Sequence, residues 1–236
     1  MIYFGDTAHS PYGDKSEQTI NRYSEGITEF LLKHGCKAIV IACNTASALA
    51  YQKLRKQHPD LLIENVIDPV VNYVGRNINS KVGIIGTRAT IKSGIYRKRL
   101  RRLNPHLHVV TAPTPLLVGV VEEGFTNTMV SKGAIETYLG NKKFSDISSL
   151  ILGCTHFPLL QKEIENYYGG RAEVVDSPEL VAHHLKLELK KAGLLNQETK
   201  MEEDRFFISE KTENFSRIAR MFFGREISLE ELDLWL

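Results

Sequence analysis

Short apolar runs rich in β-branched residues alternate with longer amphipathic runs, and this alternation is the feature that most constrains the fold. Because the short runs are apolar along their whole length, we expect strands buried on both faces, as in parallel sheets. Such alternation predicts an α/β architecture with right-handed crossovers. The strands are expected at residues 38–42, 62–67, 81–85, 107–112, 148–152, 173–175 and 205–209. The helices are expected at residues 15–34, 46–57, 70–78, 89–103, 129–140, 158–168, 178–192 and 213–223.

Length and composition indicate a globular protein without a membrane segment. The 236 residues, 42% of them hydrophobic, suffice for one large or two small domains, and a net charge of +2 demands no acidic partner. No apolar run approaches the roughly 20 residues that a membrane helix needs. The opening MIYFGDTAHSPYGDKS lacks the basic start and apolar segment of a signal peptide. We therefore expect a cytoplasmic protein with no membrane partner.

Two of the three cysteines occupy matching settings. Cys43 in VIACNTASAL and Cys154 in SLILGCTHFPLL each follow an apolar run and precede small polar residues and a predicted helix. Three cysteines in a chain of this length do not make a disulfide framework, so we expect reduced thiols. Cys36, in KHGCKAIV, is not followed by the small polar residues that follow the other two, and is interpreted as a packing residue in the core or near the surface.

The matching settings predict two related halves. In parallel α/β sheets, ligands bind beyond the carboxyl ends of the strands, where both thiols fall. We therefore predict two similar three-layer α/β domains with mostly parallel sheets, facing each other across a central cleft. Pro69 discourages helix at Asp68 and marks a possible boundary. The first domain is then expected at residues 1–67 plus 177–236, and the second at 68–176.

Two thiols on opposite walls of a cleft could invert a carbon centre, one removing a proton and the other delivering one. The reference pKa of a thiol, about 8.5, suits it to act as base or acid. A helix N-terminus after each cysteine would favour the thiolate, and His156 could exchange a proton with Cys154. Alternatively, each cysteine is only a small buried side chain. The matched settings favour a catalytic role for the two cysteines. The sequence has no C-x-x-C pair and no evident fourth ligand, so we expect no metal site.

Five segments together resemble bacterial glutamate racemases, a family of the cofactor-independent aspartate/glutamate racemase superfamily. These segments are YFGDTAHSPYG, IACNTASA, VGIIGTRATIKSGIY, PLLVGVVEEG and LILGCTHFPLL, in this order. The resemblance runs from residue 1 to the tail, where RFFISEKTENFSRIARMFFG is similar to the closing strand and helix of the family. The C-N-T and C-T-H pair belongs to the superfamily, while PYG and G-T-x-x-T favour its glutamate enzymes.

The resemblance implies racemisation of L- and D-glutamate by two bases, without pyridoxal phosphate or metal. Cys43 would exchange a proton with D-glutamate and Cys154 with L-glutamate, His156 would assist the second thiol, and Glu122 would lie near the site. The substrate would be held by Pro11, Tyr12, Gly13, Asn44, Thr45, Thr87, Thr90 and Thr155. A homodimer and a supply of D-glutamate for peptidoglycan, and hence for cell wall and cell shape, are also implied.

Each of these residues has a simpler interpretation. Threonines before helices commonly act only as caps, and Tyr12 with Gly13 could form only a turn. Asp6 could be a solvated carboxylate, and Glu122 could belong to a solvated acidic pair with Glu123.

One part of the family pattern has no counterpart here. The family begins with a strand ending in D-S-G, and the aspartate of that motif lies beside the first thiol. This chain begins at Met1 within the later YFGDT strand. We expect a start placed too far downstream rather than a paralogue that has lost activity, since the thiols, His156 and the threonines persist together. The chain alone is then expected to be weakly active or inactive, and full activity would contradict this.

Two other functions remain open at this level. The run YRKRLRRLNPHLH concentrates cations that could contact phosphates, which would suit a non-catalytic binding paralogue. Cations also suit the last turns of a helix, and no nucleic-acid motif accompanies them, so nucleic acid is not expected as a partner. A racemase for aspartate or a related amino acid would use the same chemistry with a different distance to the second carboxylate.

Overall fold

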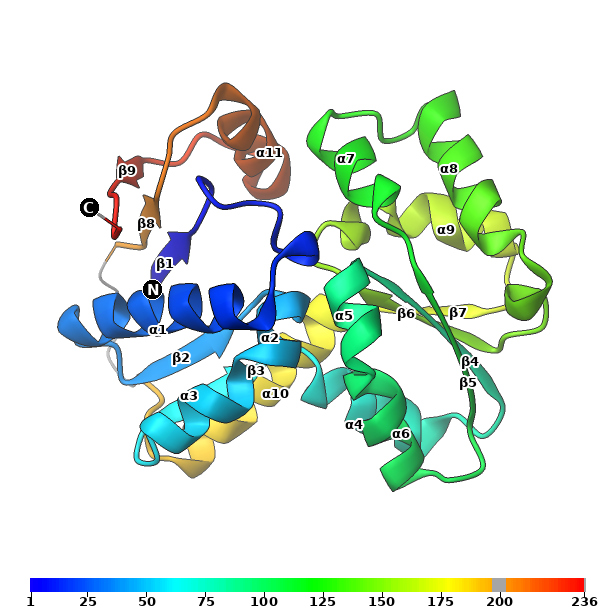
Figure 1. Ribbon diagram of the computed structural model, residues 1–236, viewed down its shortest axis with the longest axis horizontal. Helices are drawn as coiled ribbons and strands as arrows, with labels where there is room; N and C mark the ends of the chain where they lie inside the picture. Colours follow the sequence, from blue (N-terminus) through cyan, green and yellow to red (C-terminus); the bar gives the residue numbers. More distant parts are fainter. Residues whose placement is uncertain (197–202, 236) are drawn as a thin grey trace.

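The computed structural model describes residues 1–196 and 203–235, and Figure 1 shows the elements in two groups that lie side by side. The strands are β1 (Ile2–Gly5), β2 (Ala38–Ile41), β3 (Leu62–Asn65), β4 (Lys81–Gly86), β5 (His108–Pro113), β6 (Ser149–Gly153), β7 (Glu173–Val175), β8 (Arg205–Ile208) and β9 (Leu229–Glu231). The α-helices are α1 (Glu17–Lys33), α2 (Asn44–Leu49), α3 (Tyr51–Gln57), α4 (Asp68–Asn77), α5 (Arg88–Ser93), α6 (Ile95–Leu103), α7 (Leu116–Glu122), α8 (Met129–Leu139), α9 (Gln161–Tyr168), α10 (Ser177–Lys191) and α11 (Glu213–Phe223). The 3₁₀ turns are η1 (Tyr12–Asp14), η2 (Lys142–Phe144) and η3 (Phe157–Leu160).

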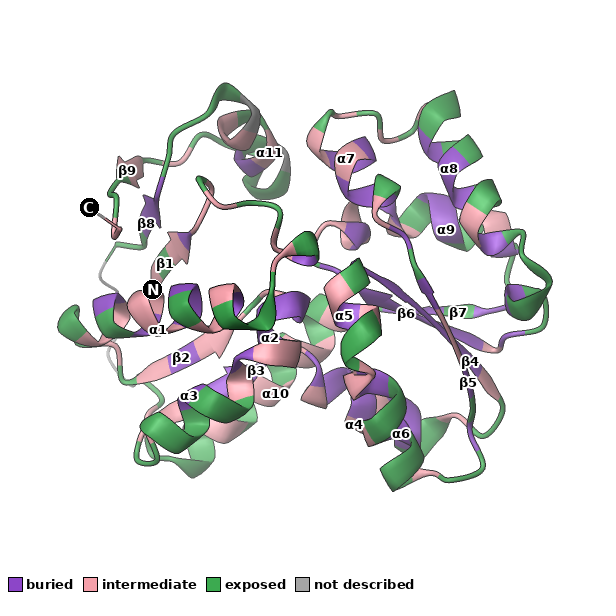
Figure 2. Ribbon diagram, viewed as in Figure 1, coloured by how far each residue is buried: buried purple, intermediate pink, exposed green. Residues whose placement is uncertain are grey.

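One group is built on a four-stranded parallel sheet in the order β5-β4-β6-β7. Along β6 the side chains alternate: Leu150 and Leu152 join the apolar cluster of α7, α8 and α9, whereas Ile151 joins that of α4 and α6. Each is buried, and burial of such a side chain contributes about 1.5–3 kcal/mol. Helices therefore cover both faces of the sheet, whose strands are mostly purple in Figure 2.

The other group combines segments from both ends of the chain. The strands β1, β8 and β9 form one parallel sheet, and β2 and β3 form another. Residues of α1, α2 and α3 bury a third apolar cluster together with Ile63 of β3. The chain thus has the predicted α/β architecture of two domains with parallel sheets. The boundaries at 67/68 and 176/177 stay predictions, and residues 197–202 and 236 of the predicted first domain lie outside the described residues.

The predicted strands are present, whereas two predicted helices are interrupted. The predicted helix 46–57 is divided at Ala50, and 89–103 is divided at Gly94, whose φ of 66° favours glycine. The sequence pattern did not predict α7 or β9. Both are short, so neither offers enough turns or alternations to establish a period.

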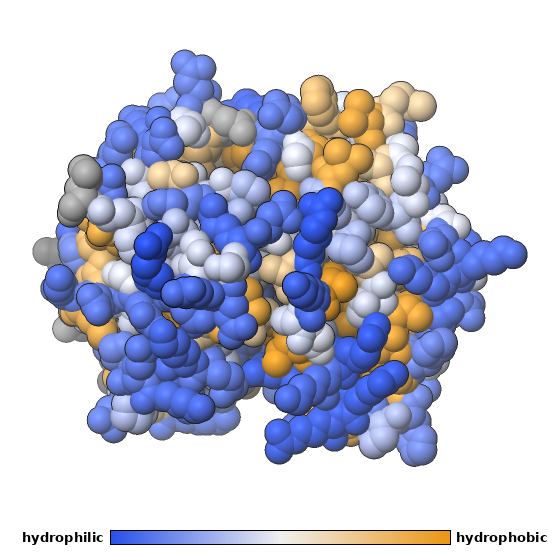
Figure 3. Space-filling model, viewed as in Figure 1, coloured by the Kyte–Doolittle hydropathy of each residue, from blue (hydrophilic) through white to orange (hydrophobic). Residues whose placement is uncertain are grey.

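The visible surface in Figure 3 is largely hydrophilic, with hydrophobic residues gathered over α7 and α8. Leu116, Met129 and Val130 of these helices are exposed.

In the basic run of residues 96–108, Arg97 donates to Thr111 and Arg99 pairs with Asp68, so part of this charge has partners within the protein. Within residues 1–196 and 203–235, no helix combines the length and apolar character needed to cross a membrane.

Candidate active site

Both cysteines lie just beyond the carboxyl end of a parallel strand, as the sequence pattern predicted. Cys43 follows β2 and is the N-cap residue of α2. Cys154 follows Gly153, the last residue of β6, and precedes η3. Because Leu150 and Leu152 face α7, the alternation of β6 also carries Cys154 into that cluster. One thiol therefore comes from each domain.

The surroundings of Cys43 act on its thiol in opposing directions. Burial raises the pKa of Cys43, and the charge of Cys154 raises it further. The backbone N–H groups of Ala46 and Thr45 and the Thr45 hydroxyl oppose this, because they donate toward the sulfur and favour the thiolate. The effect of the Cys154 charge on Cys43 shows that the two sulfurs are close enough to interact electrostatically.

Cys154 has a different set of neighbours, a histidine backed by a carboxylate. The Nδ1 atom of His156 lies 3.7 Å from the Cys154 sulfur, and its Nε2 atom lies 3.1 Å from Oε1 of Glu122. Burial lowers the pKa of His156, but hydrogen bonds to Cys154 and Glu122 and the charges of both outweigh it and raise that pKa to about 10. The raised pKa favours the protonated imidazole, whose positive charge would stabilise a Cys154 thiolate. Glu122 thus has a partner inside the site, unlike its exposed neighbour Glu123.

Three threonine hydroxyls join the two domains beside Cys43. The Oγ1 atom of Thr45 lies 2.9 Å from that of Thr87 and 3.1 Å from that of Thr90, and Thr87 donates to Thr90 at 3.0 Å. We call these residues the hydroxyl triangle; all three are buried. Thr87 also caps α5 by accepting from the Thr90 N–H, so the capping interpretation and the site interpretation both hold for it. Next to the triangle, the Tyr96 hydroxyl donates to Oδ1 of Asn44 at 2.6 Å.

The segment containing Pro11, Tyr12 and Gly13 lies on the same cleft. A Cβ atom on Gly13 would stand 2.7 Å from Cβ of Thr87, so only glycine allows this approach. Pro11 and Gly13 line a cavity of about 160 Å³ together with Thr87 and Glu122 from the second domain. This volume is below that of pockets for drug-sized ligands and suits a small molecule.

Not every predicted residue joins this cluster. Thr155 is exposed, although its neighbours Cys154 and His156 are within the site.

In the part of the chain that the structure describes, no group of three or more His, Cys, Asp or Glu residues is arranged to hold a metal ion.

Sequence reasoning missed Asp6 and Tyr96. The side chain of Asp6 is only 3% exposed and accepts hydrogen bonds from Tyr12, His9 and Ser209, so its interpretation as a solvated carboxylate was wrong. The position of Asp6 directly after an apolar run, at the end of β1, was the available signal. Its partner Ser209 is too distant along the chain for any local pattern to indicate.

Comparisons with known proteins identify a family that this chain matches. Residues 1–185 match the profile of the Asp/Glu/Hydantoin racemase family. A glutamate racemase of Chlorobaculum parvum is 39% identical over 233 residues, which is 98% of this chain and 86% of that protein.

Solved structures are similar over nearly the whole chain. The glutamate racemase of Francisella tularensis, crystallised with D-glutamate, superimposes with a TM-score of 0.90 at 34% identity and covers 99% of this chain and 88% of that one. The RacE1 isoform of glutamate racemase from Bacillus anthracis gives a TM-score of 0.92 at 32% identity, with 99% and 87% covered.

Proposed function

The chain belongs to the Asp/Glu/Hydantoin racemase family, and from this premise we propose that it is an isomerase that interconverts L- and D-glutamate. The observation that carries the proposal is the pair of thiols, each just beyond the carboxyl end of a parallel strand and one from each domain, with the charge of Cys154 acting on Cys43. The similar proteins described above are glutamate racemases, so an aspartate racemase is not favoured.

Racemisation needs one base on each face of the α-carbon. With L-glutamate bound, the Cys154 thiolate removes the α-proton, and the Cys43 thiol delivers a proton to the opposite face. The proton lost by the substrate remains on Cys154, and Cys43 becomes the thiolate, so charge and protons balance. With D-glutamate the same steps run in reverse.

The two thiolates are favoured by different groups. His156, held by Glu122, is protonated near neutral pH because its pKa is raised, and its positive charge stabilises the Cys154 thiolate. The N–H groups of Thr45 and Ala46 and the Thr45 hydroxyl stabilise the Cys43 thiolate. Both sets are in place before the substrate carbon loses its proton, which lowers the barrier by preorganisation.

Eight residues are proposed to hold the substrate, through their backbone or through hydroxyl and amide side chains. They are Pro11, Tyr12, Gly13, Asn44, Thr45, Thr87, Thr90 and Thr155. The hydroxyl triangle supports this because three buried hydroxyls satisfy one another there and could exchange those bonds for a carboxylate. Fixed donors around two carboxylates and one ammonium would orient the α-carbon between the sulfurs.

The wider role follows from the reaction and is part of the proposal. The protein supplies D-glutamate for peptidoglycan, acts in the cytoplasm and forms a homodimer. Exposed apolar side chains on α7 and α8 support self-association, which light scattering coupled to size exclusion would measure. The domains are proposed to divide at 67/68 and 176/177, and limited proteolysis would test the second boundary, where Asp176 is exposed.

The direct experiment is circular dichroism of L- and D-glutamate incubated with the protein, with L- and D-aspartate in parallel. Slow conversion of both glutamate enantiomers, faster than of aspartate, is expected, because the chain alone is predicted to be weakly active. Cys36→Ala is the matched control, because Cys36 precedes β2 and takes no part in the site. Conversion of aspartate alone, or of neither amino acid, would overturn the proposal.

A further inference from the structure

The single tryptophan of the chain, Trp235, packs against His9, which belongs to the segment that leads to Tyr12 and Gly13. After β9 the tail continues along β8, and the Leu232 N–H donates to Ile208 at 2.8 Å. The Trp235 ring then packs on Tyr23 of α1 with a centroid separation of 4.9 Å and meets His9 edge-on at 5.6 Å. A Cβ on Gly26 would stand 2.7 Å from this ring, so α1 leaves room for the indole.

Packing rather than hydrogen bonding holds the indole. Its Nε1–H is buried and has no acceptor among the described residues, which costs about 1–3 kcal/mol. A ring that stays buried despite this cost is held by its contacts with Tyr23, His9 and Gly26. Phenylalanine would retain most of these contacts without the unsatisfied group.

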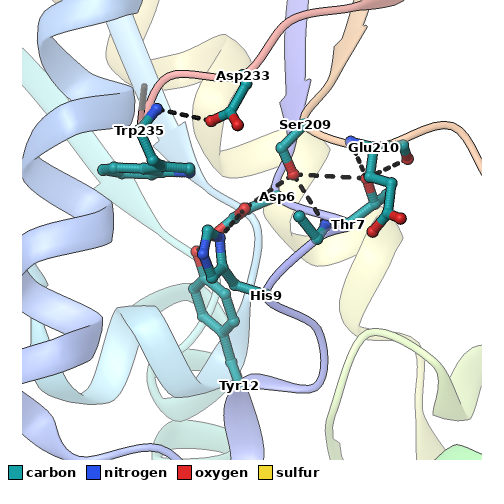
Figure 4. A network of polar contacts seen from close by, with 9 residues as sticks. Asp6, Thr7, His9, Tyr12, Ser209, Glu210, Asp233 and Trp235 are labelled. Carbon is teal, nitrogen blue, oxygen red and sulfur yellow. Dashed lines mark hydrogen bonds and ion pairs between the residues drawn. The ribbon is translucent and has the colours of Figure 1, made fainter.

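The His9 ring that Trp235 covers belongs to a network around Asp6, drawn in Figure 4. One Asp6 oxygen accepts from His9 Nδ1 at 2.8 Å and from the Ser209 hydroxyl at 2.9 Å, and the other accepts from the Tyr12 hydroxyl at 2.6 Å. Ser209 also accepts from the Ala8 N–H at 2.9 Å. The C-terminal part of the chain therefore contacts residues 6–12 through Ser209, Glu210 and Trp235.

Residues 6–13, which we call the cleft loop, border the proposed site. Tyr12 packs on the same apolar cluster as Cys43, and the charge of Cys43 acts on the Tyr12 hydroxyl. Gly13 touches Thr87 of the hydroxyl triangle. A shift of the cleft loop would move Tyr12 and Gly13 relative to the cavity.

We propose that Trp235 is a positioning residue of the racemase: by packing on His9 it holds the Asp6–Tyr12 pair and thereby the cleft loop against the site. The proposal rests on the proposed function for its kinetic part. It assigns to the C-terminal tail, which touches neither thiol, a share in substrate binding by the first domain.

The kinetic test compares Trp235→Ala with Trp235→Phe and with Leu187→Ala, an exposed apolar residue of α10. For Trp235→Ala, KM for glutamate should rise about tenfold with kcat within about threefold, because the loop grips substrate but does not transfer protons. Trp235→Phe should restore most of the loss, and Leu187→Ala should behave as the parent protein. Equal KM values in all four proteins, or equal losses in Trp235→Ala and Leu187→Ala, would overturn the proposal.

Hydrogen exchange tests the same proposal without relying on activity. In Trp235→Ala, amide protection should fall in residues 6–13 and stay unchanged in β4 and β6. Unchanged protection of the cleft loop, or a uniform loss over the chain, would overturn the positioning role. A local loss of protection in a protein that does not racemise glutamate would support the tail contact and reject the proposed function, so the two can be told apart.

Discussion

Cys43 and Cys154 occupy equivalent positions at the ends of parallel strands, yet their neighbours differ in kind. The neighbours of Cys43 are backbone N–H groups and one hydroxyl, which do not titrate. The neighbours of Cys154 are His156 and Glu122, which are titratable groups. A two-base reaction therefore does not require two identical bases. It requires a group that favours each thiolate, and the two domains provide such groups by different means.

The largest expected effect tests whether the thiols act from opposite faces. Cys43→Ala and Cys154→Ala should each lower racemisation by about 10⁴-fold, because each variant loses the thiol that removes or delivers the α-proton on that face. In D₂O, Cys43→Ala should still exchange the α-hydrogen of L-glutamate without inversion, and Cys154→Ala that of D-glutamate, as measured by NMR. Exchange of the same enantiomer by both variants would contradict the assignment of faces, and Cys36→Ala is the control.

The next effect tests whether His156 serves only Cys154. His156→Asn should lower kcat/KM by about 10²-fold, and equally in both directions because the enantiomers have the same free energy. The difference should appear in primary isotope effects: that of 2-deuterated L-glutamate should rise, because Cys154 breaks that bond, and that of D-glutamate should not. Equal rises for both would show that His156 serves both thiols.

Glu122, the carboxylate that contacts His156, is followed by a second glutamate, Glu123, which serves as its control. Glu122→Gln should lower kcat/KM by about tenfold, because the imidazolium loses a charged partner, whereas Glu123→Gln should leave it unchanged. Steady-state kinetics of both variants measure the difference. A similar loss in Glu123→Gln would mean that the general charge of the acidic pair matters rather than the contact with His156.

On the Cys43 side, Thr45→Val replaces a hydroxyl by a methyl group of similar shape. KM should rise about fivefold, since one hydrogen bond contributes about 1 kcal/mol, and Thr45→Ser should restore it. Thr87 and Thr90 still bond each other in this variant, so folding should be nearly unaffected. A loss of stability large enough to unfold the protein would assign the hydroxyl triangle to domain packing alone.

The smallest expected effect is on stability. It distinguishes the Cys154 side, whose neighbour His156 titrates, from the Cys43 side. His156 has its pKa raised from 6.5 to about 10, so its contribution to folding is fully present below pH 6.5 and is lost as pH rises through about 10. The difference in unfolding free energy between the parent protein and His156→Asn should therefore shrink between pH 6.5 and 10. Urea unfolding at several pH values measures it, and a constant difference would contradict the raised pKa.

Local patterns predicted the elements and the thiols, but not the long-range partners. The strands, both cysteines and His156 could be located because apolar runs end where polar residues begin. The burial of Asp6 could not, because it depends on Ser209 and Tyr12 meeting it in the folded chain. Gly94 divides a predicted helix because its φ is positive, which the surrounding periodicity did not reveal. Residue types thus indicated the chemistry, while tertiary contacts determine which groups share in it.

The pairing of β1 with β8 also has a consequence for synthesis on the ribosome. The strand β1 must wait for β8, which is made much later, whereas β4, β5, β6 and β7 come from one continuous stretch. The second domain can therefore fold while the nascent chain is still growing, and the first can be completed only once β8 has emerged. Until then the exposed edge of β1 would be a natural substrate for chaperones.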